Sequence, residues 1–513
     1  MARLRRAARA AADNAACLAA SLPPVLLARV WALLPLHTRF ACACVCRAWR
    51  DAAASSDAWL SLHLRGVPHS LATNALLIAA ATRAAGEMHT LDLEDCPWLL
   101  RSLFDEASLA PFVALHGASL RDLCAPRCLA AEDVALLLRN APRLCTLRAD
   151  VDCTYAEARA MLRGEEPYNG GSLRLRRLCV DMGGAAPADL LAGLEACPFP
   201  PAGLNVFNTP LDAPGALDSL LDTARTLRLR TLGLEHSRLP AAEEACEALG
   251  RLLCSRECAV TRLELSSLRG LLHTPEDATR LGDALLCART LTALELRNMK
   301  LWRRREVGAV LLDRMAPHPT LRTLLIADEV TAQAAPYVGD ALGVLIADAA
   351  CGLRTLDVCG CALNRGGLRP LLEALPRAQR LRALVLDPPH DGGLEDGDLA
   401  DDEAFREHVL LPAVVANASL WRLRVPPPTR GHRGAVRKAT QLVKERRLAA
   451  GIECLADAGV EFGPFSDDDE MSANGTDSDS AAALTDDSDG DLEPEELPPV
   501  ITTARGHFVA FDF

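Results

Sequence analysis

A six-residue unit of the form L-x-x-L-x-L recurs along most of this chain of 513 residues. Clear copies begin at Leu144, Leu175, Leu229, Val260, Leu291, Leu321, Leu353, Leu381 and Leu420. Weaker copies lie at Met88, Leu120 and Leu204. Successive copies start about 24 to 32 residues apart, with one longer gap before Leu420. A period of this length is typical of proteins built from stacked repeats, in which each repeat contacts only its neighbours.

The segments between these units are patterned as helices. Two examples are AEEACEALGRLL at residues 242–253 and PEDATRLGDALL at residues 275–286. Alternate residues of a strand point to opposite faces, so the leucines of each unit form one apolar face. A single repeat cannot bury that face, and only stacked neighbours close the core. The sequence therefore predicts an α/β fold, a curved strand-helix solenoid with Leu294 in its core.

The repeats resemble leucine-rich repeats of the ribonuclease-inhibitor type, because the intervals are long and the segments between the units look fully helical. In that type of repeat, a Cys or Asn three residues after the last strand leucine hydrogen-bonds the turning backbone. The resemblance assigns this role to Cys96, Cys128 and Cys361. Ser237 and Met299 stand at the same place in other repeats, where we expect the hydrogen-bond ladder to break and the loops to be irregular.

The residues between the leucines of each unit point away from the core, into the concave side of the solenoid. The charged residues at these positions are Asp92, Glu94, Arg148, Asp150, Arg177, Asp181, Glu235, Glu264, Glu295, Arg297, Asp357 and Asp387. We expect this face as a whole to bind a protein, with candidate contacts at Asp92, Glu94, Arg148, Asp181, Glu235, Glu264, Glu295 and Asp357. The alternative is that the charges only keep an exposed face soluble. Under either interpretation Glu295 should be exposed, and its replacement by Ala should hardly change stability.

A second pattern lies between Leu22 and Leu64, where the chain reads LPPVLLARVWALLPLHTRFACACVCRAWRDAAASSDAWLSLHL. The apolar spacing predicts a short helix that starts at the prolines after Leu22 and stops at Pro35, followed by a second helix through Val45 and Trp49. The LPxxLL start, the LPL turn, the VCxxW core and the trailing Trp59 resemble an F-box, in the same order and spacing. The segment after Trp49, DAAASSDA, is blander than in most members of that family.

The resemblance implies an adaptor role. F-box helices dock on the Skp-type adaptor of an SCF complex, a cullin-RING ubiquitin ligase, while the rest of the chain selects the substrate. The residues that would face or support the adaptor are Leu22, Pro23, Leu26, Val30, Leu34, Val45 and Trp49. The alternative is an ordinary two-helix cap on the first repeat, because a repeat array needs a cover for its open apolar end.

The net charge of -13 is concentrated in one segment. Residues 466–497 contain 13 acidic residues and no basic ones, and removing them from the 68 acidic residues leaves 55, equal to the 55 Lys and Arg. The rest of the chain is close to neutral and offers no basic surface for a phosphate backbone, so we expect no nucleic-acid partner. The acidic segment is expected to be disordered, and Ser466, Thr476 and Ser488 resemble sites for an acidophilic kinase of the casein-kinase-II type.

The 19 cysteines and the remaining motifs point to no redox or catalytic chemistry. Without a secretory apolar region at the N-terminus, the cysteines are expected to be reduced. Cys42, Cys44 and Cys46 could suggest zinc, but only Cys42 and Cys46 share a helix face, and we favour buried small apolar residues. No phosphate-binding, zinc-protease or hydrolase motif is present, and no apolar run of about 18 residues would span a membrane. We therefore expect no enzyme activity, cofactor or metal.

These patterns divide the chain into six expected segments: an N-terminal basic extension at 1–20, an all-α F-box at 21–66, leucine-rich repeats at 70–428, a basic capping helix at 429–463, a disordered acidic tail at 464–499 and an apolar segment at 500–513. The first segment could instead be a transit peptide, the basic helix a localisation or docking patch, and the last an edge strand or peptide ligand. The predicted function is substrate recognition in an SCF-type ligase, in the cytoplasm, the nucleus or both. The alternative is a leucine-rich-repeat scaffold or inhibitor without a ligase role.

Overall fold

The computed structural model describes residues 22–32, 34, 39, 47–63, 80–93, 109–165, 175–268, 270–328, 330–331, 333–361, 363–386, 405–424 and 434–450. Expectations for the N-terminal extension, the CxCxC cysteines, Val45, Glu94, Cys96, Asp387 and all residues after 450 lie outside this part of the chain. The chain divides into two units, Met1–Met471 and Ser472–Phe513. Every described residue belongs to the first unit.

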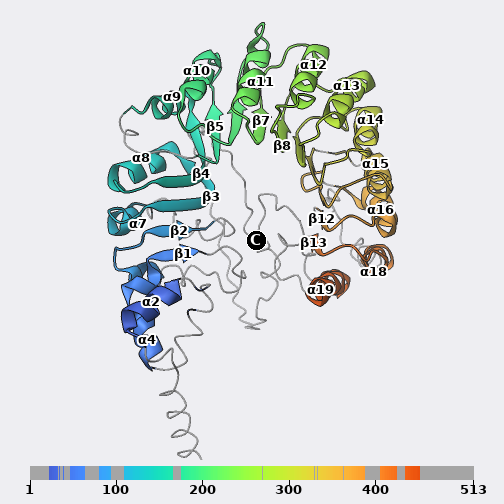
Figure 1. The fold of residues 1–513 in the computed structure, drawn as a ribbon. Coiled ribbons are helices and arrows are strands. Elements are labelled where there is room, and N and C mark those ends of the chain that lie inside the picture. The colour runs from blue at the N-terminus through green and yellow to red at the C-terminus, as the bar shows by residue number, and fades with distance from the viewer. Residues whose placement is uncertain are drawn as a thin grey trace, which may run out of the picture. The chain divides into compact units, whose positions relative to one another are not determined.

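The described residues form one parallel sheet of 13 strands, arranged in sequence order (Figure 1). The strands are β1 (Ser61–His63), β2 (Thr90–Asp92), β3 (Asp122–Ala130), β4 (Thr146–Thr154), β5 (Arg177–Asp181), β6 (Gly203–Phe207), β7 (Thr231–Glu235), β8 (Arg262–Ser266), β9 (Ala293–Arg297), β10 (Thr323–Ala327), β11 (Thr355–Asp357), β12 (Ala383–Val385) and β13 (Arg422–Arg424). Every predicted repeat unit contains one strand, from β2 to β13, and the predicted strand-helix solenoid is confirmed.

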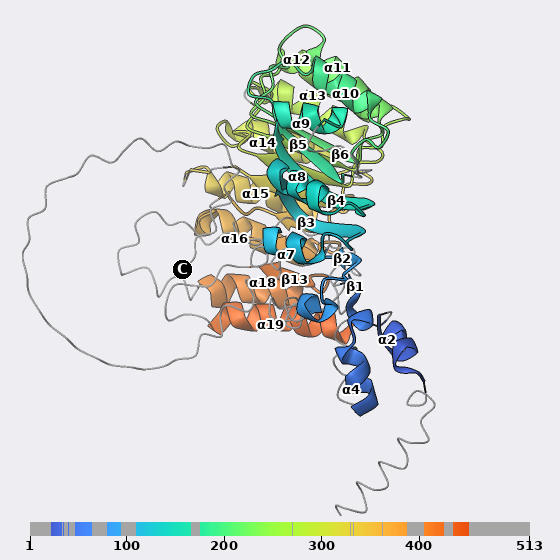
Figure 2. The ribbon, with the colours of Figure 1, turned by 90° about the vertical axis from the view of Figure 1, so that its left-hand side faces the viewer.

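Helices connect most strands and cover one side of the sheet. They are α7 (Leu109–His116), α8 (Ala131–Asn140), α9 (Tyr155–Arg163), α10 (Ala188–Ala196), α11 (Ala216–Thr226), α12 (Ala242–Leu253), α13 (Pro275–Leu286), α14 (Arg305–Met315), α15 (Ala335–Ala347), α16 (Arg365–Ala374) with η3 (Leu375–Arg377), and α18 (Leu411–Ala416) after the π-helical η5 (Arg406–Leu410). Within this unit the strands lie on the inner side of the arc and the helices on its outer side (Figures 1 and 2).

The leucines of neighbouring units lie in register. Leu263 pairs with Leu294, and Leu294 with Leu324, and all three side chains are fully buried. The second leucine of each unit repeats the arrangement, since Leu265 pairs with Leu296. Two continuous apolar rows therefore run through the sheet, and they belong to a single hydrophobic core that also includes the helices.

Local sequence fixes where several helices begin. Thr154 precedes α9 and forms a capping box with Glu157, because each residue's side chain accepts the backbone N–H of the other. Thr274 and Asp277 do the same at α13. These reciprocal bonds satisfy N–H groups that have no partner within the helix, so each strand-to-helix turn has a defined end.

The hydrogen bond expected from a cysteine after the strand is present at Cys361. Cys361 is buried, and its Sγ donates to the carbonyl of Ile326 at 3.2 Å. The expected break at Ser237 is wrong, because the Ser237 Oγ accepts the N–H of Thr209 at 3.3 Å and takes the same role. Met299 is buried and apolar, and nearby the carboxylate of Asp328 accepts the N–H groups of Lys300 and Leu301 instead.

The end of the described repeats is covered by α19 (Gly434–Ala449), within the segment expected to hold a basic capping helix. This helix contacts α18 and β13. The guanidinium of Arg446 donates to the carbonyls of Val414, Val415 and Asn417, which lie at the C-terminal end of α18. Cations at this end of a helix are favourable, so Arg446 has a structural role. Among the described helices, none combines the length and apolar character that crossing a bilayer requires.

Replacing Leu294 by Asp should destabilise the protein by at least about 3 kcal/mol, because an unpaired carboxylate would replace a side chain in the stacked core. Urea unfolding measures the change. Val344→Asp is the matched control, because Val344 is an exposed residue of α15 and should tolerate the same chemistry. Equal losses in the two variants would contradict the stacked-leucine core.

Lowering the pH should destabilise the protein through His318, which is buried between α14 and β10. Its Nδ1 accepts the N–H of Leu321 at 3.0 Å, and its Nε2 lies 3.0 Å from the Leu285 carbonyl, so the neutral ring is held in place. Burial is the main cause that lowers the pKa of His318 below its ordinary 6.5. The hydrogen bond to Leu285 opposes this shift, and the charge of Arg322 adds to it. Because the unfolded chain binds the proton more readily, this stability is present above pH 6.5 and is lost as the pH falls below it.

Urea midpoints measured between neutral and mildly acidic pH test this. His318→Asn should be less stable at neutral pH and should lose less of its stability on acidification than the wild type. An identical slope in the two proteins would exclude His318 as the source.

Candidate protein-interaction surfaces

The first candidate surface lies on α2 (Pro24–Ala32), which starts at the predicted prolines and has two different apolar faces. Leu27 and Trp31 are buried against α4 (Arg47–Ala54) and η2 (Ser56–Trp59). Leu22, Leu26 and Val30, spaced four residues apart, are 40%, 48% and 46% exposed. This spacing places Leu26 and Val30 along one side of the helix, and Leu22 lies just before its first turn. The helix therefore presents an apolar stripe that no described residue covers.

Aromatic packing sets the orientation of α2. The Trp31 ring meets that of Trp49 edge to face, with centroids 5.8 Å apart. Trp59 is buried, and its indole Nε1 donates to the carbonyl of Ala53 at 2.6 Å. Trp49 and Trp59, which the sequence singled out, thus hold α4 and η2 against the inner face of α2, while its outer face stays open.

Arg39 connects this helical module to the first strand. Its buried guanidinium donates to the carbonyls of Ala32 and Leu34 at one end of α2, and to those of Ala58 and Ser61 at the start of β1, at 2.7–2.9 Å. Burial lowers the pKa of Arg39 to about 10. Sequence reasoning missed this residue, because nothing in its spacing shows that a single side chain gathers four distant carbonyls.

The predicted adaptor residues fall into three groups. Leu22, Pro23, Leu26 and Val30 are exposed, as a docking surface requires. Leu34 and Trp49 are partly buried and pack against the core, so they support the surface. The remaining predicted residue, Val45, lies outside the described part of the chain.

A small helical module with an uncovered apolar stripe is thus joined to a repeat sheet. Residues 19–65 match the family model described as F-box-like, and the N-terminal module is therefore an F-box-like domain. No curated protein matches the chain. The matched residues include β1 (Ser61–His63), so the first strand of the sheet belongs to the F-box-like segment.

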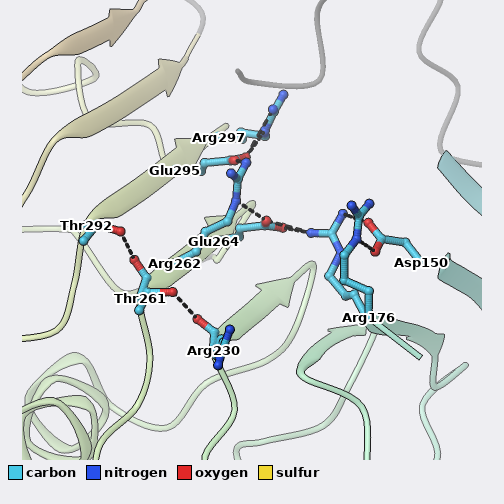
Figure 3. Close-up of polar contacts among 10 residues, drawn as sticks. Asp150, Arg176, Arg230, Thr261, Arg262, Glu264, Thr292, Glu295 and Arg297 are labelled. Carbon is cyan, nitrogen blue, oxygen red and sulfur yellow. Dashed lines mark hydrogen bonds and ion pairs between the residues drawn. The ribbon is translucent and has the colours of Figure 1, made fainter. Parts of the chain in front are cut away.

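The second candidate surface is a line of charges on the strand side of the sheet, between β4 and β9 (Figure 3). The Arg176 Nε lies 2.7 Å from Asp150, and the Arg177 Nη2 lies 3.3 Å from the same carboxylate. The Arg177 Nη1 also donates to both oxygens of Glu264, at 2.7 and 2.8 Å. Arg262 then joins Glu264, at 2.8 Å, to Glu295.

The line ends at Arg297, whose Nη2 lies 3.3 Å from Glu295. Four arginines therefore alternate with three carboxylates from β4 to β9. The paired side chains are mostly less than a third exposed, which places the charges in a medium less polar than water. The network leaves little uncompensated charge.

Glycines allow Arg177 on β5 to reach Glu264 on β8. In the pairing register, Arg177 lies beside Gly203, and a Cβ there would lie 3.3 Å from the Arg177 Cγ. Glu264 lies beside Gly233, where the Asn205 side chain fills the space that a Cβ would take. A side chain at Gly203 would press on Arg177, and one at Gly233 would collide with Asn205, so the small residues of β6 and β7 leave room for the side chains along the bridge.

The predicted concave residues are less accessible than the sequence suggested. Glu295 does lie between the core leucines of β9, but it is only 5% exposed, and the expectation of an exposed Glu295 is wrong. Two arginines cover it. Asp357 is also buried, and its Oδ1 accepts the N–H of Cys359 at 2.9 Å. Asp181 accepts the N–H of Gly183 at 3.0 Å and so holds the turn after β5.

Three other predicted residues remain at least partly accessible. Arg148 is exposed, Asp92 lies 3.7 Å from the ring of His63, and Glu235 is half-buried. Burial is the main cause that raises the pKa of Glu235, while His236 and Arg297 oppose it. Sequence reasoning missed Arg176 and Arg262. A usable signal existed for Arg262, because RLE on β8 and ELR on β9 place opposite charges two residues apart on one face.

Replacing Glu295 by Ala should lower the free energy of unfolding by about 1–3 kcal/mol, because it leaves two partly buried guanidinium groups without their shared carboxylate. A double-mutant cycle with Arg262→Ala should give a coupling energy of about 0.5–3 kcal/mol. Urea unfolding measures both quantities. Arg148→Ala, an exposed arginine of β4, is the control and should change stability by about 0.5 kcal/mol or less. A Glu295→Ala variant as stable as this control would contradict a structural role for the network.

Proposed function

We propose that the chain is the substrate-recognition subunit of an SCF-type cullin-RING ubiquitin ligase. The observation that carries this proposal is the exposed stripe of Leu26 and Val30 on α2 with Leu22 just before the helix, inside the segment that matches the F-box-like family. F-box domains bind Skp-type adaptors, and an apolar stripe is the surface that such a helix-to-helix contact needs. The chain would supply recognition rather than chemistry.

The sheet that follows is proposed to be a leucine-rich-repeat array of the ribonuclease-inhibitor type. Strand-helix alternation and the Cys361 hydrogen bond support this assignment. The proposed divisions remain the F-box at 21–66, the repeats at 70–428 and the capping segment at 429–463. The partners would be a Skp-type adaptor, a cullin scaffold and a protein substrate, in the cytoplasm, the nucleus or both, without a cofactor, nucleic acid or membrane.

The concave side is the proposed substrate surface. Among the predicted contacts, Arg148 is the most accessible, and Asp92, Asp181, Glu235 and Glu264 are partly exposed. Glu295 and Asp357 are buried and would act by holding their neighbours in place rather than by direct contact. A substrate would therefore meet the rims of the charge network more than its centre.

A repeat scaffold or inhibitor without a ligase role is the alternative. Such a protein would use the same concave side. It gives no reason, however, for three large apolar side chains to remain exposed on and just before one helix, because burying such a side chain is worth about 1.5–3 kcal/mol. The uncovered stripe is what favours the ligase subunit.

Full-length protein should co-purify with a Skp-type adaptor and a cullin. The double variant Leu26→Asp/Val30→Asp should lose the adaptor, since it places charges in the centre of the apolar contact, and it should still fold because both side chains are exposed. Affinity purification with mass spectrometry detects the partners, and a urea melt checks the fold.

Val344→Asp serves as the matched control, an exposed apolar residue on α15, and it should retain the adaptor. Wild-type protein that brings down no adaptor would overturn the ligase proposal. Retention of the adaptor by the double variant would place the docking surface elsewhere.

A further inference from the structure

A row of arginines lies at the start of the strands in the C-terminal part of the sheet. Arg322, Arg354 and Arg382 each directly precede a strand, and Trp421 takes the same place before β13. Backbone hydrogen bonds connect these positions from one repeat to the next. The N–H of Arg354 donates to the carbonyl of Arg322, that of Arg382 to that of Arg354 and that of Trp421 to that of Arg382, at 2.6–2.7 Å. Neighbouring strands are about 4.8 Å apart, so these side chains are stacked along one edge of the sheet.

The same edge is neutral around β8 and β9. There the equivalent residues are Thr261 and Thr292, and each hydroxyl donates to the carbonyl of the residue before it in the row, at 3.1 and 3.0 Å (Figure 3). Threonine therefore satisfies the backbone at this place without charge. The arginines before β10 to β12 therefore add positive charge at a position that threonine fills without charge before β8 and β9.

The charges of this row lack carboxylate partners among the described residues. No ion pair of Arg354 or Arg382 is present there, whereas the arginines of the central network are each paired. The Arg382 guanidinium lies over the Trp421 ring, 3.7 Å from its centroid. Burial and the like charge of Arg354 both lower the pKa of Arg382, so an anion placed between the two would relieve their repulsion.

A hollow of about 330 Å³ lies between the loops that lead into β11 and β12, and its lining includes Leu353 and Leu381, which directly precede Arg354 and Arg382. Apolar side chains line it, among them Ile346, Leu353 and Leu381, and Arg377 and Arg380 lie at its side. One carboxylate, that of Asp348, also lines it and accepts the N–H of Ala350 at 2.7 Å. Arg322 is bound to the carbonyls of Gly352 and Pro319, which form part of the same loop region.

We infer that this edge, the row of Arg354 and Arg382 with the hollow and Arg380 beside it, binds an acidic extended segment of the protein substrate, with one apolar side chain of that segment in the hollow. The inference rests on the proposed function and names the class of substrate that the repeats would select. Guanidinium groups hold carboxylates through two parallel hydrogen bonds, and the like-charged row gains when an anion arrives.

A peptide fits this surface better than a nucleic acid. The row, which has no carboxylate partners among the described residues, covers three strands, about 10 Å, and this is too short to follow a phosphate backbone over many nucleotides. The hollow is lined by aliphatic and charged side chains and by no aromatic ring, whereas bases are bound by stacking on aromatic rings, and Trp421 is already covered by Arg382. An acidic peptide with an apolar anchor matches both the charge and the shape.

Fluorescence anisotropy with the full-length protein tests the inference. The probe is a labelled peptide of glutamate and glycine with one central leucine. It should bind, and added salt should weaken the binding. The double variant Arg354→Gln/Arg380→Gln should bind at least about tenfold more weakly. Both arginines are exposed, so this variant should keep the wild-type urea midpoint.

Arg230→Gln is the matched control, an exposed arginine at the same position before β7, and it should bind the peptide like the wild type. Replacing the leucine of the peptide by glycine should also weaken binding, since the hollow would lose its occupant. The inference is overturned if the full-length protein does not bind the peptide, if the double variant binds as tightly as Arg230→Gln, or if a single-stranded RNA of equal charge binds as tightly as the peptide.

Adaptor co-purification on the same proteins separates the two proposals. If the wild type binds the adaptor but not the peptide, only the acidic-segment inference is refuted. A wild type that binds the peptide but no adaptor refutes the ligase subunit and leaves the peptide site in place.

Discussion

The register of the stacked leucines is the constraint on which the rest of this fold depends. Leu263, Leu294 and Leu324 occupy equal positions on neighbouring strands, and none could be buried by its own repeat. Parallel pairing in strict sequence order follows, because any slip by one residue would turn the leucines toward the solvent. A stack of this kind also leaves an open apolar face at each end. The segments at the two ends must therefore cover these faces, whatever other function they have.

The F-box-like domain covers the first of these ends. Trp59 belongs to the F-box pattern, yet it also stands where the first leucine of a repeat unit would be, since Leu62 pairs in register with Leu91. Arg39 adds four hydrogen bonds that join α2 to the start of β1. The cap interpretation is therefore compatible with the proposed docking role, because Leu26 and Val30 stay exposed while Leu27 and Trp31 belong to the common core. A bound adaptor would be held to the sheet by a buried connection rather than by a loose linker.

Sequence patterns were sufficient for the features that depend on spacing alone. The period of the units located β2 to β13, and the LPxxLL pattern located the helix with Leu26 and Val30 on its surface. Strand β1 was missed because Trp59 replaces the first leucine of its unit. Glu295 was placed on the correct side of its strand but was expected to be exposed, since alternation defines a face and not what covers it. The bridge from Arg177 to Glu264 depends on Gly203 and Gly233, on the two neighbouring strands that lie between them, a relation between residues far apart in the chain that no local pattern contains.

The distribution of charge divides the strand side of the sheet into two parts with different binding properties. In the centre, each arginine of the network already has a carboxylate, so a ligand that took one partner would leave the other partly buried and unpaired, at a cost of several kcal/mol. At the edge before β10 to β12, Arg354 and Arg382 repel one another, and an anion would remove that repulsion without breaking an existing pair. The central network therefore favours a fixed shape, whereas the C-terminal edge favours capture of acidic chains. Among the described residues, Arg354 and Arg382 are therefore the groups expected to contribute most of the electrostatic selectivity of the proposed binding surface.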